Sequence, residues 1–222
     1  METRKELGEG CWVTHDREWL TAAEADEALT ALTEQVAWEE RPIVAFGREI
    51  MQPRLIGWGG ALPYAYSGQT LPERPLTPAL DALLVRVSAA CGVPFNHVLL
   101  NRYRDGRDHM SMHADNEPQL GREPVIAALS LGASRKFRLE FKRKRSRKRT
   151  FNLIHGSLFV MGGALQHRWR HAVPKMASVT GERINVTFRV LHGPPGWRAP
   201  TEDTPRPPYA ERSDAGRSKS TQ

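Results

Sequence analysis

The sequence predicts an α+β fold that is mainly β, in which two N-terminal helices precede a sandwich or jelly roll. Apolar residues recur at helical spacing only before residue 95, whereas residues 95–192 form short apolar segments bounded by glycine, proline or polar turns. We expect one domain over residues 20–192, with a helical part at 20–94 and a β core at 95–192. Residues 1–19 show no sustained pattern and are expected to be a lead-in. Residues 193–222 are rich in Pro, Arg, Glu and Ser and are expected to be a disordered tail.

The two helices are marked by the residues at their ends. Thr21-Ala22-Ala23-Glu24 matches a capping box, and the apolar residues that follow at helical spacing predict a helix over about 22–37. Thr77 can cap a second helix, and Pro78 suits its first position because the ring fixes φ at a helical value. Gly92 suits the end of that helix.

Six segments after residue 95 are expected to be strands, because each is short, apolar and mostly bounded by turn residues. They span residues 98–100, 125–131, 137–141, 151–154, 157–161 and 184–191. Several short strands at close spacing are typical of two packed sheets.

The net charge of +7 comes from one segment. Residues 142–149 hold seven cations and no anion, so the rest of the chain is formally neutral. The cations are Lys142, Arg143, Lys144, Arg145, Arg147, Lys148 and Arg149. Charge concentrated in this way indicates contact with a polyanion at one place, the plainer alternative being a solvated surface loop. Because the segment lies between two expected strands, we expect it at a hairpin tip.

Two classes of protein are disfavoured by composition. Cys11 and Cys91 are too few and too far apart for a disulfide framework or a zinc cluster, which fits a reducing cytoplasm. No apolar run approaches the length of a membrane helix, and no apolar signal core follows the N-terminus. We therefore expect a cytoplasmic protein that has no membrane partner.

His113-Ala114-Asp115 is the first motif that carries chemistry. In an extended segment, residues two apart point the same way, so this imidazole and carboxylate can bind one metal. With one more histidine they form the two-histidine, one-carboxylate set that leaves positions open on iron(II), whereas zinc sites more often use other ligands. Four histidines are candidates for the third ligand: His109, His155, His167 and His171. His109 is too near on the same segment and His155 lies beside Gly156 at an expected turn, so spacing leaves His167 and His171 open.

The stretch from Arg183 to Arg189 alternates polar and apolar residues without a break. Its polar face consists of Arg183, Asn185, Thr187 and Arg189. This face can be the solvated side of an ordinary half-exposed strand, or its guanidiniums can line a pocket for a dicarboxylate, which arginine binds through paired hydrogen bonds. Upstream, Asn101 and Tyr103 share a face and can each donate a hydrogen bond to a carboxylate.

These segments, in this order, resemble the AlkB family of nucleic-acid dealkylases over roughly residues 40–192. The matching motifs are Asn101-x-Tyr103, His113-x-Asp115, His171-x-Val173-Pro174 and Arg183-x-Asn185-x-Thr187-Phe188-Arg189. The resemblance implies a double-stranded β-helix, which is a jelly roll, with bound iron(II) and with 2-oxoglutarate and O2 as cosubstrates. The pattern is nearer to the animal-type paralogues that repair duplex and single-stranded DNA than to the founding bacterial enzyme.

The resemblance also implies a role for each matched residue. The implied iron ligands are His113, Asp115 and His171, and the implied 2-oxoglutarate contacts are Asn101, Tyr103, Arg183, Asn185 and Arg189. Contacts with the target base are implied for Tyr64, Tyr66, Glu117 and Arg54. Phe46 resembles a hydrophobic wedge that fills the gap left by a flipped base, the alternative being a plain core aromatic.

The implied function is oxidative demethylation of N1-methyladenine and N3-methylcytosine in DNA, with release of formaldehyde. We expect a monomer, associated with the nucleoid in a bacterium or located in the nucleus of a eukaryote. The alternatives are a 2-oxoglutarate oxygenase that acts on RNA, protein or a small molecule, and a non-catalytic nucleic-acid-binding module.

Overall fold

The structure is a computed structural model that describes residues 3–45, 48–66 and 69–193. Phe46 and residues 194–222 of the expected tail lie outside the described residues, and for Tyr66 only the backbone is described. Among the described helices, none has the length and apolar character needed to span a membrane.

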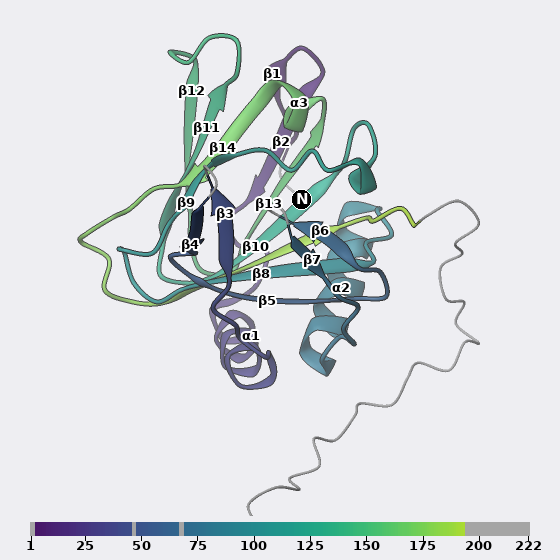
Figure 1. Ribbon diagram of the computed structural model, residues 1–222, viewed down its shortest axis with the longest axis vertical. Coiled ribbons are helices and arrows are strands. Elements are labelled where there is room, and N and C mark those ends of the chain that lie inside the picture. The colour runs from purple at the N-terminus through teal and green to yellow at the C-terminus, as the bar shows by residue number, and fades with distance from the viewer. Residues whose placement is uncertain (1–2, 46–47, 67–68, 194–222) are drawn as a thin grey trace, which may run out of the picture.

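Two antiparallel sheets form the body of the domain (Figure 1). The large sheet has seven strands in the order β1 (Lys5–Gly8), β2 (Cys11–Asp16), β13 (Ser157–Gly163), β10 (Ile126–Gly132), β15 (Arg183–Arg189), β8 (His97–Tyr103) and β5 (Leu55–Gly60). The small sheet has four strands in the order β12 (Lys148–Leu153), β11 (Arg135–Phe141), β14 (Trp169–Val173) and β9 (Met110–His113). Side chains from both sheets, such as Phe159 and Phe137, pack together in one core cluster. The predicted jelly roll is confirmed.

Both predicted helices are present and cover one face of the large sheet. α1 (Ala22–Gln35) begins at the Thr21–Glu24 capping box, and α2 (Pro78–Cys91) ends at Gly92, whose φ of 64° is left-handed. Their apolar sides share a second core cluster with β8, β10, β13 and β15. Figure 1 shows the two helices together at the bottom, with the β11–β12 hairpin extending away from them at the top. The remaining helices are short: η1 (Pro118–Leu120) and α3 (Leu165–Arg168).

The lead-in predicted for residues 1–19 is wrong. β2 pairs along its whole length with β13, and β1 pairs with β2 at the edge of the large sheet. Leu7, Cys11 and Val13 are buried in the core between the sheets. The strands are short and their alternation is weak, so their pairing depends on a partner far along the chain.

The predicted helical part, residues 20–94, also contains five strands. Two pairs form small hairpins: β3 (Pro42–Ala45) with β4 (Arg48–Met51), and β6 (Tyr64–Tyr66) with β7 (Gln69–Leu71). β5 joins the large sheet beside β8 although glycine is rare inside strands. A Cβ at Gly57 would lie 2.4 Å from Val36, and one at Gly59 would lie 2.8 Å from Leu76, so close packing requires glycine there.

The basic run lies at the predicted hairpin tip. β11 and β12 pair antiparallel, and residues 142–147 join them. β12 begins at Lys148 rather than at residue 151, so the last two cations, Lys148 and Arg149, belong to the strand.

Candidate functional site

The three implied iron ligands come together where β9 and β14 lie side by side. His113 and His171 are direct cross-strand partners, and their ring centroids are 4.1 Å apart. Asp115 follows β9, and its Oδ1 lies 3.4 Å from His113 Nε2 and 3.8 Å from His171 Nε2. One ligand atom from each residue lies within 4.8 Å of the other two. The arrangement is therefore the facial set of two imidazoles and one carboxylate that suits iron(II).

The protonation states of these three groups fit metal binding. His113 Nδ1 contacts the main-chain oxygen of Ser111 at 2.9 Å, so a proton on Nδ1 leaves Nε2 free to bind a metal. Burial, and after it the neighbouring His113, lower the pKa of His171 to about 3, so His171 is neutral at pH 7. Burial opposes ionisation of Asp115, but Arg189 holds the pKa of this carboxyl well below its usual range.

The other three histidine candidates for the third ligand are engaged elsewhere. His109 Nδ1 contacts the main-chain oxygen of Arg107. His155 accepts a hydrogen bond from the Gly132 N–H and lies 3.3 Å from Asp26 of α1. His167 contacts the main-chain oxygen of Arg122. The register of β14 against β9 thus selects His171, which spacing along the sequence left open.

A pocket between the sheets extends from the three ligands to the residues implied to bind 2-oxoglutarate. Its lining includes Asn101, Tyr103, Asn185, Thr187 and Arg189 beside the three candidate ligands. Arg183, Thr187 and Arg189 are buried and Asn185 is partly buried, so the half-exposed alternative for β15 is wrong. The polar face of β15 points between the sheets because its apolar face is already covered by the helices.

Arg183 has donors that fit an incoming carboxylate. It is 1% exposed, and its Nη2 donates to Ser130 Oγ and Asn185 Oδ1, each at 2.8 Å. Its Nε and Nη1 are buried and have no hydrogen-bond partner among the described residues. Buried donors of a charged group are costly to leave unpaired, so this site fits the far carboxylate of 2-oxoglutarate.

Arg189 lies nearer the metal ligands than the far end of the pocket. Its Nη2 lies 2.6 Å from Asp115 Oδ2, and both side chains are buried. Its Nη1 is buried without a partner in the described part of the chain. Arg189 thus orients the candidate iron carboxylate, and its implied contact with 2-oxoglutarate stays a prediction.

Two of the implied base contacts lie beside the ligands. Tyr64 is fully buried, with its ring centroid 5.0 Å from that of His97 and 5.4 Å from the Arg189 guanidinium carbon. Burial and then the nearby Asp115 raise the pKa of Glu117, and Glu117 Oε2 is buried. Both side chains interact electrostatically with Asp115 and Arg189, and their contact with a base stays a prediction.

Arg54 does not lie on an open rim. It is 5% exposed, and its Nε donates to Asn101 Oδ1 at 2.6 Å while Nη2 donates to Gln52 Oε1 at 2.5 Å. Arg54 therefore orients an implied 2-oxoglutarate contact from behind, and its contact with the base stays a prediction.

The seven cations of the basic run divide into two groups. Lys142 Nζ donates to the main-chain oxygen of Gln166 at 2.9 Å, and the Arg147 guanidinium lies 4.9 Å from the Phe141 ring and 5.2 Å from the Trp169 ring. Both are partly buried and hold the hairpin against the domain. The other five are exposed: Arg143, Lys144, Arg145, Lys148 and Arg149.

Gln166 is a site residue that sequence reasoning missed. It is fully buried on α3, its Oε1 accepts the main-chain N–H of Asp115 at 3.0 Å, and its Nε2 lies 3.7 Å from Met161 Sδ. A helix of four residues leaves no periodic signal in the sequence, and the contact spans 51 positions.

Replacing Gln166 with leucine should weaken metal binding by about tenfold, the lower end of the usual loss when a group behind the ligands is removed. The acceptor that fixes the main chain at Asp115 would be lost while side-chain volume is nearly kept. Titration of the protein with Mn²⁺ without cosubstrate measures the affinity. Gln119→Leu is the matched control, because Gln119 contacts Pro63 and Ala65 instead. Equal affinities for the two variants would contradict the role of Gln166.

Three comparisons agree with this geometry. Residues 13–189 match the model of the 2OG-Fe(II) oxygenase superfamily. The human protein named alpha-ketoglutarate-dependent dioxygenase alkB homolog 3 is 38% identical over 181 residues, which are 78% of this chain and 63% of that protein. The human and Arabidopsis thaliana proteins named DNA oxidative demethylase ALKBH2 are 35% and 32% identical and are covered over 69% and 68% of their lengths.

A solved structure of OsALKBH1 has the same fold. The TM-score is 0.59 at 14% identity, and the match covers 83% of this chain and all of that one. The chain spans about 63% of the length of the alkB homolog 3 protein. On the family model, the relatives and the metal-binding geometry together, the chain belongs to the AlkB family within the 2OG-Fe(II) oxygenase superfamily.

Proposed function

We propose that the chain is an iron(II)- and 2-oxoglutarate-dependent DNA demethylase that removes methyl groups from N1-methyladenine and N3-methylcytosine. In the proposed reaction, 2-oxoglutarate and O2 are converted to succinate and carbon dioxide, and the methyl group leaves as formaldehyde. The single observation that carries the proposal is one pocket lined by the His113–Asp115–His171 set and by Asn185, to which the buried Arg183 donates a hydrogen bond.

Each part of the pocket has a task in this reaction. Iron(II) would supply the oxidation of the methyl group when it is bound by His113, Asp115 and His171 with the cosubstrates present. Arg183 would bind the far carboxylate of 2-oxoglutarate through its free Nε and Nη1, and Tyr103 and Asn101 would donate to its other oxygens. Arg189 holds Asp115 ionised and in place.

The acidic side of the site favours a cationic base. N1-methyladenine and N3-methylcytosine carry a positive charge, and Glu117 lies beside Asp115 with a buried oxygen that can accept a hydrogen bond from an exocyclic amine. The Tyr64 ring is buried between His97 and the Arg189 guanidinium, so a contact with the base would require it to become accessible. A methylated base pairs poorly, so it leaves the stack at lower cost, which contributes to selectivity.

The exposed cations of the β11–β12 hairpin support a nucleic acid as substrate rather than a protein or small molecule. Arg143, Lys144 and Arg145 are exposed at the hairpin tip, where they can contact backbone phosphates. The proposal includes the expected location, which is the cytoplasm, the nucleoid of a bacterium or the nucleus of a eukaryote.

Release of formaldehyde from methylated oligonucleotides tests the proposal. We expect release from N1-methyladenine and N3-methylcytosine oligonucleotides only when iron(II), 2-oxoglutarate and O2 are all present, and none from the unmethylated strand. Comparing formaldehyde release from single-stranded DNA, duplex DNA and RNA of the same sequence identifies the preferred nucleic acid. Turnover of 2-oxoglutarate without any formaldehyde would point to a different substrate. No binding of 2-oxoglutarate at all would overturn the proposal.

A further inference from the structure

Arg135 ties together the three segments that carry the metal and cosubstrate residues. It begins β11, is 1% exposed, and donates from Nη1 to the main-chain oxygen of Asp105 at 3.0 Å. Its Nη2 donates to the main-chain oxygens of Asp108 at 2.7 Å and Pro174 at 2.9 Å. Two of these carbonyls lie in the loop between β8 and β9, and the third directly follows β14.

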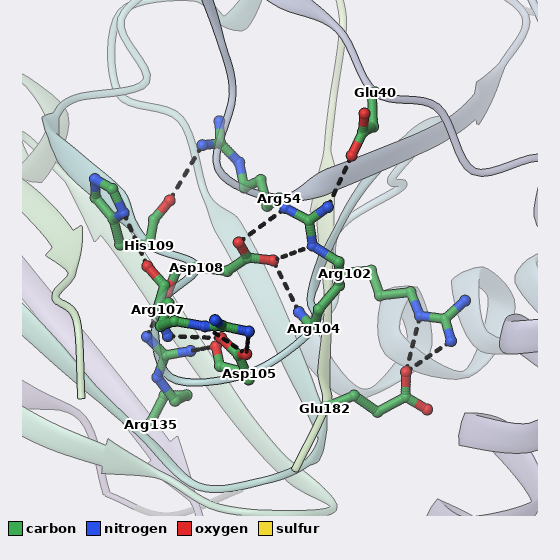
Figure 2. A network of polar contacts seen from close by, with 10 residues as sticks. All are labelled: Glu40, Arg54, Arg102, Arg104, Asp105, Arg107, Asp108, His109, Arg135 and Glu182. Carbon is green, nitrogen blue, oxygen red and sulfur yellow. Dashed lines mark hydrogen bonds and ion pairs between the residues drawn. The ribbon is translucent and has the colours of Figure 1, made fainter. Parts of the chain in front are cut away.

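The loop between β8 and β9 is held from several directions (Figure 2). Within it, Arg104 pairs with Asp108 at 2.8 Å and Arg107 pairs with Asp105 at 2.6 Å. A Cβ at Gly106 would lie 1.8 Å from the main-chain oxygen of Met176, so the loop is pressed against the segment after β14. Tyr103 ends β8 before this loop, and Met110 begins β9 after it. The position of Tyr103 relative to His113 therefore depends on the loop that Arg135 anchors.

Arg135 also lies against Tyr103 itself. The Arg135 guanidinium carbon is 5.3 Å from the centre of the Tyr103 ring, and that of Arg183 is 5.4 Å from the same centre. Among the described residues, the hydrogen bonds of both guanidiniums go to hydroxyl, amide and main-chain oxygens, none of them a carboxylate. Nε of Arg135 and Nε and Nη1 of Arg183 are buried without a partner in the described residues.

Two buried positive charges that hydrogen-bond to no carboxylate are expensive in the free protein. Asp105 and Asp108 attract Arg135 from nearby, but each already pairs with another arginine of the loop. Burying a charge stays costly unless an opposite charge or sufficient hydrogen bonds offset it. A neutral side-chain amide has two N–H donors and could hydrogen-bond to two of the three carbonyls, so most of the loop's anchoring does not by itself require a cation. Burial lowers the pKa of Arg183 to about 10, and the charge of Arg135 adds to that lowering. Binding of a dianion in the pocket would offset the cost of burying these two positive charges.

We propose that Arg135 is a positioning residue for the cosubstrate, which fixes the Tyr103 end of the pocket and adds a second buried positive charge for the far carboxylate. The inference rests on the proposed function, because it takes 2-oxoglutarate as the dianion. Arg135 acts through Tyr103 and the three carbonyls and is not itself assigned a contact with the cosubstrate.

Ligand binding to the Mn²⁺-loaded protein without O2 tests this role apart from catalysis. Arg135→Gln keeps amide donors and removes the charge, and it should raise the Kd of 2-oxoglutarate by about 10- to 100-fold, the size of a lost charged interaction. Oxalate can chelate the metal but has no far carboxylate, so its Kd should change less than about threefold on the same scale. Arg135→Lys keeps the charge but lacks the planar guanidinium, so its Kd for 2-oxoglutarate should lie between those of Arg135→Gln and the wild type.

Arg102→Gln is the matched control, because Arg102 neighbours Tyr103 on β8 but pairs with Glu182 at 2.7 Å instead. It should bind both ligands as the wild type does. An unchanged Kd of 2-oxoglutarate in Arg135→Gln would overturn the inference. An equal rise in the Kd of oxalate would also overturn it, because it would indicate general misfolding. If Arg135→Gln does not fold, the ratio of the two Kd changes in Arg135→Lys decides. A wild-type protein that fails to bind 2-oxoglutarate would instead refute the proposed function.

Discussion

Replacing His113 with alanine should reduce formaldehyde release and 2-oxoglutarate turnover to the background rate. The loss should exceed the roughly 10- to 100-fold expected when a group behind the ligands is removed, because a ligand itself is lost. The fold should survive, since the His113 side chain is 31% exposed and its main-chain contact is with the Ser111 oxygen, two residues away on the same strand. Mn²⁺ titration, turnover and thermal unfolding on one preparation separate loss of metal from loss of structure.

The histidine four residues earlier provides the control for this variant. His109→Ala removes an imidazole from the same segment, and its ring contacts the Arg107 oxygen rather than the ligands. It should keep metal affinity and turnover. Normal turnover in His113→Ala, or a loss in His109→Ala as large as that in His113→Ala, would contradict the ligand assignment.

Asp115 is a poorer site for the same test. Its carboxylate neutralises Arg189 in a pair that is buried on both sides. Asp115→Ala would leave the guanidinium buried and unpaired, which typically costs about 3–5 kcal/mol. Lost activity in that variant would therefore mix lost metal with lost stability, whereas His113→Ala changes the metal site alone.

The two long helices could be predicted from sequence because their signals are local. The Thr21–Glu24 box, Pro78 and Gly92 each act within one helical turn, and all three have their predicted place in the structure. The order of the motifs likewise predicted the jelly roll and the pairing of two histidines with Asp115.

The strands that were missed depend on partners far along the chain. β2 pairs with β13. β5 contains Gly57 and Gly59 because Val36, at the end of α1, and Leu76, before α2, pack directly against these two positions. Neither contact leaves a pattern within the strand itself. Sequence reasoning therefore assigned residues 1–19 and 55–60 to irregular or helical parts.

The site was predictable as a set of residues but not as a set of contacts. The choice of His171 needed the register of β14 against β9, and the pairing of Arg189 with Asp115 joins residues 74 positions apart. A contact with the target base was implied for Arg54, yet its side chain lies behind Asn101 because β5 pairs with β8. Buried polar contacts of this kind are set by the tertiary fold, and the sequence pattern is silent on them.

Neutralising the tip of the β11–β12 hairpin should weaken DNA binding and flatten its dependence on salt. The variant Arg143→Gln, Lys144→Gln, Arg145→Gln removes three exposed cations and keeps Lys142 and Arg147, which hold the hairpin in place. If each lost cation meets one phosphate, the log–log salt slope should fall by about 2.7 on duplex DNA. Between about 50 and 200 mM salt, the fall in affinity should then be about 40-fold smaller than for the wild type.

A control with the same change of charge separates a local contact from a general field. Arg17, Arg86 and Lys175 are exposed outside the hairpin, and their replacement by glutamine also removes three charges. If the whole charge of the protein attracts DNA, the two triple variants should have equal salt slopes. If the hairpin binds the DNA backbone directly, only the hairpin variant should have a smaller salt slope. Both variants should turn over 2-oxoglutarate without DNA at the wild-type rate. Unchanged binding in the hairpin variant would leave its cations as a solvated loop.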